Sequence, residues 1–529
     1  MTIVNLVNGI PTASLGSIPK LTAFFHEQDM QNPASVHEKL VWELSAILFD
    51  EVTAETGLKV TAQDESRIRR NLLSTFWMNL VDDASSRSIG MARSPEEKAV
   101  AALSGHRVAD ACKYLLDGKN FRLATLVSLI GTNDQSKRDM REQVKEWHDG
   151  KLLSEFSEPI RTIYELLGGN VCVCEGKKGS MEDRIEAFVI SKRFGLSWKQ
   201  AFGLRLWYAI SVNDDASAAV DLFKDDIDQD KETRPQPWYT EQGIPGLWED
   251  PDKELREDLL WGLLRLFANG QADLEDILRP ENSQLSPLDF RLSWQLGRAL
   301  LDSGKVSFGQ DANAKADAVT LSFASQLTNE GSWLEAVFVL LHLSNPSARV
   351  KAIQEHLSRH AGQLGTEQSE SFNTLTQTLK IPTAWIWQAK ALFMRSVKKD
   401  PKSEVVCLLR ASSFVEAHKT FAKQVAPAAI VERDYDGLYN ILMDFKGHED
   451  SIPDWNLGGE IYKDFLQLMH HRQRGVPVPH AFIDSLMEGL PAMHENAQST
   501  DITEVAAVAD MANYVARVVV DLAKKGGVS

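Results

Sequence analysis

The fold of this chain is decided by the stretch that reads His106-Arg107-Val108-Ala109-Asp110-Ala111-Cys112 and then Asn120-Phe121-Arg122-Leu123-Ala124. Asn120 suits a helix N-cap, and apolar residues come after it at helical spacing up to Ile130, which gives one apolar face. Gly118 and Gly131 stand just past two helix ends, where glycine is common. The residue types indicate packing between helices rather than chemistry. The helices expected here span 107–118, 120–130, 136–147 and 159–167.

A short helix-start unit recurs along the chain. It consists of a capping serine, an aromatic residue, two further residues and an alanine. The aromatic residue and the alanine are three positions apart, so they share a helix face on which one fills space and the other leaves it. The recurrence predicts an α-helical array of stacked pairs, although the irregular spacing leaves chance and ordinary capping as the alternative. The copies are residues 197–201, 332–336 and 413–417.

The composition is that of a folded protein with an acidic surface. Hydrophobic residues make up 43% of the 529 residues and charged residues 25%, and the net charge is −17. This charge argues against direct nucleic-acid binding, because phosphate contacts need a basic surface. Four cysteines in so long a chain fit a reducing compartment. Since no apolar run approaches the ~18 residues that span a bilayer, we expect a soluble intracellular protein without membrane insertion.

The N-terminal segment differs from the rest. Ile3 to Val7 is strand-like and Asn8-Gly9 is a turn signal, but Pro11, Gly16 and Pro19 interrupt the chain beyond this turn. From Val36 onward the periodicity is helical, and three further helices are expected between residues 456 and 525. The predicted class is all-α, an irregular helical stack with a short non-helical N-terminal segment.

No site for chemistry is predicted. His356 and His360 are four apart on one helix face, but the position after the first histidine, which is glutamate in zinc proteases, is Leu357. Cys172 and Cys174 lack zinc-ligand spacing, so two thiols in a loop are expected. The glycine- and lysine-bearing loop of residues 168–180 lacks the pattern of a phosphate loop. We therefore expect no catalytic residue, no cofactor and no metal, and the protein is not expected to be an enzyme.

Several separated motifs, in order, resemble the signature of the nucleoporin 96 family, whose fungal form is nucleoporin 145C. The resemblance covers most of the chain from about Val36 to Lys446, and this chain is similar to the fungal members. The motifs that carry it are residues 106–112, 120–124, 143–147 and 161–169, followed by residues 195–206, 287–296 and 332–343.

The resemblance implies a structural scaffold of the nuclear pore coat, the Y complex, located at the nuclear envelope and supporting nucleocytoplasmic transport. It also implies the ancestral coatomer element, in which helices run out along a trunk, fold back as a crown, return through the trunk and end in a tail. The segments implied here are an N-terminal segment 1–35, the outgoing trunk 36–105, the crown 106–283, the returning trunk 284–446 and the tail 447–529.

The resemblance further implies three partners. The crown would pair with nucleoporin 107 (fungal nucleoporin 84). The tail would meet hub members of the nucleoporin 85 and nucleoporin 120 (human nucleoporin 160) type. A β-blade before the trunk would insert into the Sec-thirteen propeller. Because the residues before Val36 contain one strand-like run, we expect this blade to be missing or truncated here. The alternatives are a vesicle-coat cage protein of the same fold and another helical-repeat adaptor.

A candidate crown interface comes after the loop of residues 168–180. Ile185, Phe188, Val189 and Lys192 are expected on one helix of about residues 181–194, and they mix apolar and charged groups as an interface does. The alternative is that the three apolar residues are crown core. Two neighbouring aromatic residues, Trp207 and Tyr208, are predicted to lie in the core.

Overall fold

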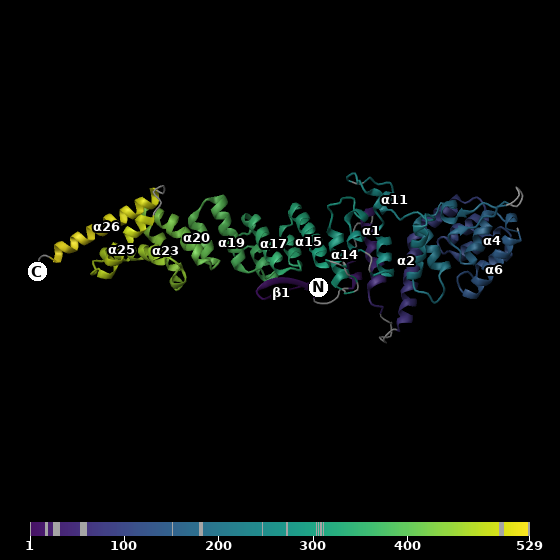
Figure 1. Cartoon of the computed structure of the whole chain (residues 1–529), viewed down its shortest axis with the longest axis horizontal. Coiled ribbons are helices and arrows are strands. Elements are labelled where there is room, and N and C mark those ends of the chain that lie inside the picture. The colour runs from purple at the N-terminus through teal and green to yellow at the C-terminus, as the bar shows by residue number, and fades with distance from the viewer. Residues whose placement is uncertain are drawn as a thin grey trace. The chain divides into compact units, whose positions relative to one another are not determined.

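The computed structural model describes residues 2–15, 20–24, 32–52, 61–150, 152–178, 184–245, 247–270, 273–302, 304, 306, 309, 311–496 and 502–526. They form two compact units, one of Leu15–Gln326 and one of Thr2–Ser14 with Leu327–Ser529. Both units consist mainly of helices, and the described strands form two-stranded sheets (Figure 1). The predicted all-α class is therefore confirmed.

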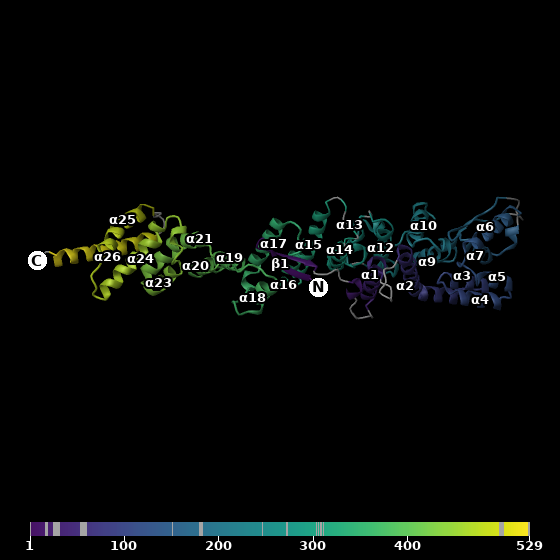
Figure 2. The same cartoon turned by 90° about the horizontal axis from the view of Figure 1, so that it is seen from below.

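Unit 1 contains the four helices predicted between residues 106 and 169, which are now α4 to α7. Helices α3, α4 and α5 lie together in Figure 2. The elements of unit 1 are α1 (Pro33–Phe49), α2 (Ala62–Met91), α3 (Pro95–Leu103), α4 (Val108–Asp117), α5 (Phe121–Val127), α6 (Asp134–Asp149), α7 (Glu158–Leu167), β3 (Val173–Cys174), β4 (Phe188–Val189), α8 (Ile190–Arg193), α9 (Trp198–Leu204), α10 (Ser217–Asp228), α11 (Trp238–Glu241), α12 (Leu259–Ala268), α13 (Leu274–Ile277), α14 (Arg291–Asp302) and α15 (Ala312–Asn329).

The predicted capping role of Asn120 is wrong in its detail. Asn120 precedes α5, but its side chain makes no capping hydrogen bond and instead donates to Glu96 Oε1 at 2.5 Å. Its ψ is 58°, outside the extended range that is typical of an N-cap residue, and Lys119 before it has a left-handed φ of 62°. The turn between α4 and α5 therefore ties this pair to α3.

Unit 1 brings together helices that are far apart in the sequence. Helix α1 packs against α12, and Glu38 on α1 receives a hydrogen bond from Arg291 Nη1 at the start of α14 (2.8 Å). Trp77 on α2 donates from Nε1 to the carbonyl oxygen of Lys199 on α9 at 2.7 Å. A stack in which each helix contacts only its sequence neighbours cannot make these contacts, so this unit folds back on itself.

Five aromatic rings fill the centre of this unit: Trp77, Trp198, Phe202, Phe223 and Trp261. The rings of Trp77 and Phe202 are 4.7 Å apart and those of Phe223 and Trp261 are 5.1 Å apart, both edge to face. Such pairs add to the stabilisation that burial of the rings already provides. The cluster joins α2, α9, α10 and α12.

The recurring helix-start unit packs as predicted in all three copies, but only one of its three serines caps a helix. The three alanines, Ala201, Ala336 and Ala417, are at most 1% exposed, as close helix approach requires. Ser197 forms a full capping box with Gln200, whereas the corresponding serines of the other two copies make no capping hydrogen bond. Space left by the alanine, rather than the cap, is what the three copies share.

A buried ionic cluster lies where α9 ends. Arg205 has a fully buried side chain, and its Nη2 lies 2.6 Å from Asp226 Oδ2 and 2.8 Å from Glu232 Oε1. Its Nη1 donates to the carbonyl oxygen of Ala201 at 2.7 Å. The π-helical turn Arg205–Ala209 also buries Trp207 and Tyr208, as the sequence predicted. The cluster therefore anchors the end of α9 to α10 and the loop after it.

Acid is expected to destabilise unit 1 through His37. This residue is 5% exposed and stacks on Trp238 at 5.6 Å, and its Nε2 has no hydrogen-bond partner among the described residues. Burial lowers the pKa of His37 to about 3. The unfolded chain takes up a proton below pH ~6.5 while the folded chain does not, so stability present above that pH falls as the pH drops. At pH 5 the loss is about 2 kcal/mol.

This loss can be assigned with the variant His37→Phe, whose ring can stack on Trp238 without titrating. Urea unfolding followed by tryptophan fluorescence measures the free energy of unfolding at pH 7.5 and at pH 5. The decrease in this free energy from pH 7.5 to pH 5 should be about 2 kcal/mol smaller in the variant than in the natural chain. Equal decreases in the two proteins would show that another group is responsible.

Unit 2 holds the remaining elements, including the three C-terminal helices that the sequence predicted. Helix α26 packs on α22 as well as on α25. The elements are β1 (Thr2–Val7), β2 (Ile10–Leu15), α16 (Trp333–Leu340), α17 (Pro346–Arg359), α18 (Glu370–Asn373), α19 (Thr383–Phe393), α20 (Pro401–Arg410), α21 (Phe414–Thr420), α22 (Ala426–Glu432), α23 (Tyr435–Asp444), α24 (Gly459–Gln473), α25 (His480–Asn496) and α26 (Ile502–Gly526).

The N-terminal segment forms a hairpin of two strands where the sequence predicted one. Asn8 and Gly9 both have positive φ (52° and 77°), as the turn of a two-residue hairpin requires. Pro11 was expected to interrupt the chain, but β1 is the one described strand that pairs with β2, and such an edge strand tolerates proline. Gly16 and Pro19 lie outside the described residues. The second strand attaches to unit 2, since Ala13 N donates to the carbonyl oxygen of Leu341 at 3.2 Å.

Candidate interaction surfaces

The four predicted interface residues do not lie on one helix. Phe188 and Val189 form β4, which pairs antiparallel with β3, and Ile185 pairs with Lys177 beyond it. Only Lys192 lies in a helix, the four-residue α8. The spacing of the four residues fits one face of a helix, but the β-branched and aromatic residues in and beside both strands favour a hairpin. Residues 179–183, between the two arms, are outside the described part of the chain.

Close packing at Gly176 favours this hairpin. A Cβ atom at Gly176 would lie 2.6 Å from the backbone nitrogen of Ala187 and 2.8 Å from the carbonyl oxygen of Ile185. Real Cβ atoms do not approach backbone atoms so closely, so glycine lets the two arms meet here. Helical periodicity in the sequence gives no information about this contact.

The environments of the four residues differ. Ile185 is 6% exposed and belongs to the core, as the alternative interpretation held for it. Phe188 is half-buried beneath the guanidinium of Arg161, 5.3 Å from its ring centre, and Val189 is also half-buried. Lys192 is exposed and donates from Nζ to the carbonyl oxygen of Asp230 at 3.1 Å. Of the four, Phe188, Val189 and Lys192 can reach a partner, and their interface role stays a prediction.

Three exposed apolar side chains lie on the α4–α5 pair and the turn that follows it. Leu116, Phe121 and Leu129 are 48%, 63% and 58% exposed. They fall within the segment that the resemblance assigns to the crown, so we call these three residues the crown patch. Sequence periodicity assigned Phe121 to the buried face, but that face consists of Leu123, Ala124 and Val127. Helical spacing gives a signal for Phe121 alone, because Phe121 and the exposed Thr125 are four apart on α5, whereas Leu129 lies beyond the end of this helix.

The N-terminal hairpin exposes apolar side chains on β1. Ile3, Leu6 and Val7 are 45%, 54% and 55% exposed. On the other strand, Thr12 receives a hydrogen bond from Arg349 Nη2 at 2.8 Å, which joins β2 to α17. A strand with exposed apolar residues can add to another sheet.

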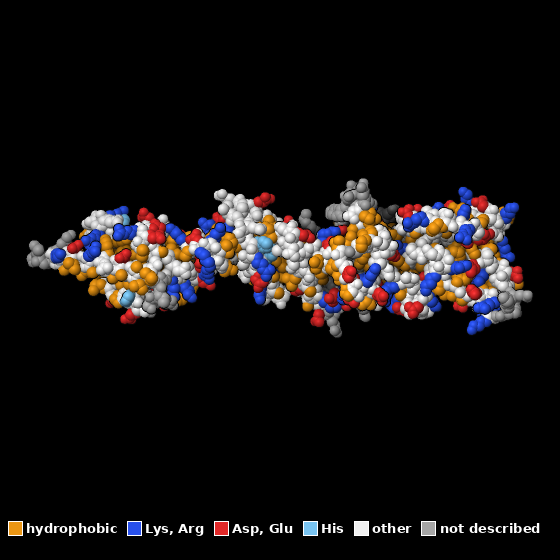
Figure 3. Space-filling view, turned by 90° about the horizontal axis from the view of Figure 1, so that it is seen from above, with side chains coloured by type: hydrophobic (Ala, Val, Ile, Leu, Met, Phe, Trp, Pro, Cys, Tyr) orange, Lys and Arg blue, Asp and Glu red, His pale blue; other side chains and the backbone are white. Residues whose placement is uncertain are grey.

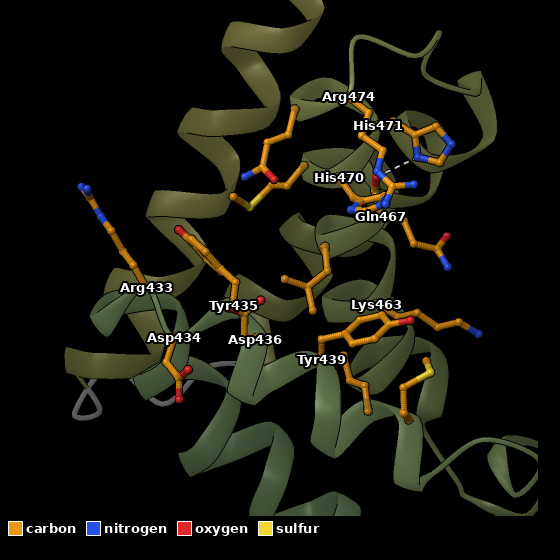
Figure 4. A pocket seen from close by; sticks show the side chains of 15 residues that line it. Arg433, Asp434, Tyr435, Asp436, Tyr439, Lys463, Gln467, His470, His471 and Arg474 are labelled. Carbon is orange, nitrogen blue, oxygen red and sulfur yellow. Dashed lines mark hydrogen bonds between the residues drawn. The ribbon is translucent and has the colours of Figure 1, made fainter.

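A hollow of about 760 Å³ lies between α23 and α24. Tyr439 lies between the two helices, whereas the side chains of Arg433 and Lys463 point away in opposite directions (Figure 4). His471 Nδ1 lies 2.9 Å from the carbonyl oxygen of Gln467. Arg433 and Lys463, two basic side chains of this hollow, therefore do not converge on one point.

The candidate metal ligands have structural contacts. His356 donates from Nε2 to the carbonyl oxygen of Trp333 at 2.9 Å. Cys172 and Cys174 are buried free thiols, and burial raises the pKa of each to about 12, which keeps both protonated and unreactive. Within the described ranges, no group of three or more His, Cys, Asp or Glu could hold a metal ion. No described helix is long and apolar enough to cross a bilayer.

Comparison with protein families matches residues 97–393 to the family described as nuclear protein 96 (Nup96). Among curated proteins, the chain is 40% identical over 478 residues to nucleoporin NUP145 of Chaetomium thermophilum, covering 89% of this chain and 23% of that protein. It is 30% identical over 458 residues to nucleoporin nup189 of Schizosaccharomyces pombe, covering 82% and 24%.

An animal protein is similar over the same region. The chain is 27% identical over 457 residues to nuclear pore complex protein Nup98-Nup96 of Drosophila melanogaster, covering 84% of this chain and 22% of that protein. The chain thus spans about a quarter of the length of these three relatives.

Proposed function

Because this chain belongs to the Nup96 family of nuclear pore proteins, we propose that it is a non-enzymatic scaffold of the nuclear pore coat, the Y complex. The family match over residues 97–393 carries the proposal. Its relatives are nuclear pore proteins, which places it at the nuclear pore complex in the nuclear envelope and favours the pore over a vesicle coat. As a scaffold it would support the transport of protein and mRNA through the pore.

The scaffold would act through three surfaces. The crown patch would pair with a protein of the nucleoporin 107 or nucleoporin 84 type, because its three exposed apolar side chains are the kind that a partner buries. The C-terminal helices α24 to α26 would meet hub members of the nucleoporin 85 and nucleoporin 120 type. The β1–β2 hairpin would add strands to the Sec-thirteen propeller, which the exposed residues of β1 support.

Substitution of Phe121 tests the crown contact. The variant Phe121→Asp should weaken binding of the nucleoporin 107-type partner by roughly 100-fold, since it places a charge in an apolar contact. Size-exclusion chromatography with light scattering, followed by titration calorimetry, measures this change. The fold should be unaffected because Phe121 is 63% exposed.

Leu288→Asp is the matched control, because Leu288 is 72% exposed in unit 1 and lies outside the crown patch. It should bind like the natural chain. Phe188→Asp, measured in parallel, tests the interface first predicted from the sequence. A partner that binds the natural chain and Phe121→Asp equally well would exclude the crown patch, and a folded partner that binds neither would contradict the scaffold proposal.

A further inference from the structure

We propose that the groove between α25 and α26 docks one amphipathic helix of a partner protein, with a basic edge of that helix along α25 and an acidic edge along α26. The groove has a volume of about 610 Å³, and every side chain that lines it is apolar except His494. We call it the tail groove. The inference deepens the tail contact and rests on the proposed function for its place in the pore coat.

The tail groove is an apolar surface that the described residues of unit 2 leave uncovered. Helix α26 buries one face against α22 and α25, through residues such as Met511 and Val518, which are at most 2% exposed. On α26 the groove is lined by the buried Val508 and Val515 and by a second face, on which Ala512 and Ala516 are exposed and Val520 is 51% exposed. Hydrophobic side chains gather over these C-terminal helices in Figure 3. A continuous apolar surface of this kind marks a site of protein contact.

The shape of the groove fits a helix. Ala512 and Ala516 are one turn apart, so their small side chains let a partner backbone come close. On the opposite wall, Met487 is 57% exposed and Leu490 is buried, which gives a wall against which apolar side chains can pack. This is how an amphipathic helix is held in a groove, with anchors at successive turns.

Pro491 adds a polar feature to the groove. It lies inside α25 and lines the groove, and it has no amide hydrogen to donate to the carbonyl oxygen of Met487 one turn earlier. A backbone acceptor that loses its helical donor needs another donor once a partner excludes water. A lysine or arginine on the partner helix can supply that hydrogen bond.

Charges on the two walls define the edges of the occupant. Glu488 and Glu495, both exposed on α25, stand three residues before and four residues after Pro491, so each is one turn from a residue that lines the groove. Arg517 and Lys524, both exposed on α26, stand three residues before and four residues after Val520, so each is one turn from a residue that lines the groove. No ion pair joins any of these four residues to another described residue. A basic edge along α25 and an acidic edge along α26 would pair with them, as edge charges do between helices of a coiled coil.

A second copy of this chain fits less well than a partner helix. In a two-fold symmetric dimer the same surface of each copy meets the other, so the tail groove of one copy would face the tail groove of the other. Neither groove would then be filled by a helix. A single helix from another protein fills the groove and satisfies both charged walls.

Fluorescence anisotropy with three designed peptides of roughly 20 residues, long enough to form a helix, tests the proposal. All three carry the same Leu/Ala face, with Lys on one edge and Glu on the other, Lys on both edges, or Glu on both edges. The full chain should bind the mixed peptide roughly tenfold more tightly than either of the others. Arg517→Glu should shift the preference to the peptide with Lys on both edges.

Ala512→Arg fills the groove and should weaken binding of the mixed peptide by roughly 30-fold or more. Ala481→Arg is the matched control, because Ala481 is exposed on α25 outside the groove, and it should bind the mixed peptide as tightly as the natural chain does.

Absence of binding by the natural chain, or equal binding by the natural chain and Ala512→Arg, overturns the proposal. So does a dimer of the natural chain that Ala512→Arg converts to a monomer, because the occupant is then a second copy. Crown binding measured on Ala512→Arg separates this inference from the proposed function, since failure of the groove alone leaves that binding intact.

Discussion

Replacing Arg205 with methionine should lower the free energy of unfolding of this protein by about 3–5 kcal/mol. Methionine occupies much of the volume of the arginine stem but removes the positive charge. Glu232, whose side chain is 3% exposed, then remains buried without its counter-ion, and the half-buried Asp226, at 18%, loses its ion pair as well. Glu232 keeps the hydrogen bond from Ser191 Oγ at 2.5 Å, which is too little to offset a buried, unpaired charge. Urea unfolding followed by tryptophan fluorescence measures the loss.

Two further variants identify the cause of this loss. Arg193→Met removes an ion pair with Glu158 in which both side chains are well exposed, so it should cost no more than about 1 kcal/mol. Arg205→Met combined with Glu232→Gln should recover part of the loss, because the buried charge is removed together with its partner. If Arg205→Met and Arg193→Met lower the free energy of unfolding equally, the buried ionic cluster contributes no more to stability than an exposed ion pair.

The second large effect is expected from Trp261→Ala, which should cost about 3–5 kcal/mol. Trp261 is 1% exposed and contacts Trp198, Phe202 and Phe223 edge to face. Its removal leaves a cavity beside rings that come from other helices, and a rigid cluster of this kind collapses only partly. Far-ultraviolet circular dichroism is the suitable measurement, because the substitution also removes a fluorophore.

Trp248→Ala provides the control for this substitution. Trp248 is 37% exposed in the loop after α11, so its removal should change the free energy of unfolding by no more than about 0.5 kcal/mol. A similar loss in both variants would mean that the aromatic cluster contributes no more than a single surface ring.

Several features could be predicted from the sequence because they depend on local pattern. The apolar spacing and glycine punctuation between His106 and Gly169 predicted α4 to α7, and the same criteria predicted α24 to α26. The buried positions of Trp207 and Tyr208 were also predicted correctly. In each case the residue types favour one environment: glycine favours helix ends, and apolar and aromatic side chains favour the core.

Strands and exposed surfaces were predicted less well. The i, i+3, i+4, i+7 spacing of Ile185, Phe188, Val189 and Lys192 matched a helix, but a short apolar run fits a strand equally well. The deciding contact is between Gly176 and the backbone of Ala187, and it exists only once the two arms are folded together. The second N-terminal strand was missed for a related reason, since its attachment to Leu341 is a contact between residues that are far apart in the sequence.

The sequence by itself determined the helical class, the positions of the longer helices and the family to which the chain belongs. Only the tertiary structure decided which apolar faces are covered. Phe121 and Val127 belong to the same helix, yet one is 63% exposed and the other fully buried, and the apolar face of Ala512 and Ala516 stays open while that of Met511 is closed. The physical reason is that helical periodicity depends on neighbours one turn away, whereas burial depends on which distant helix packs against each face.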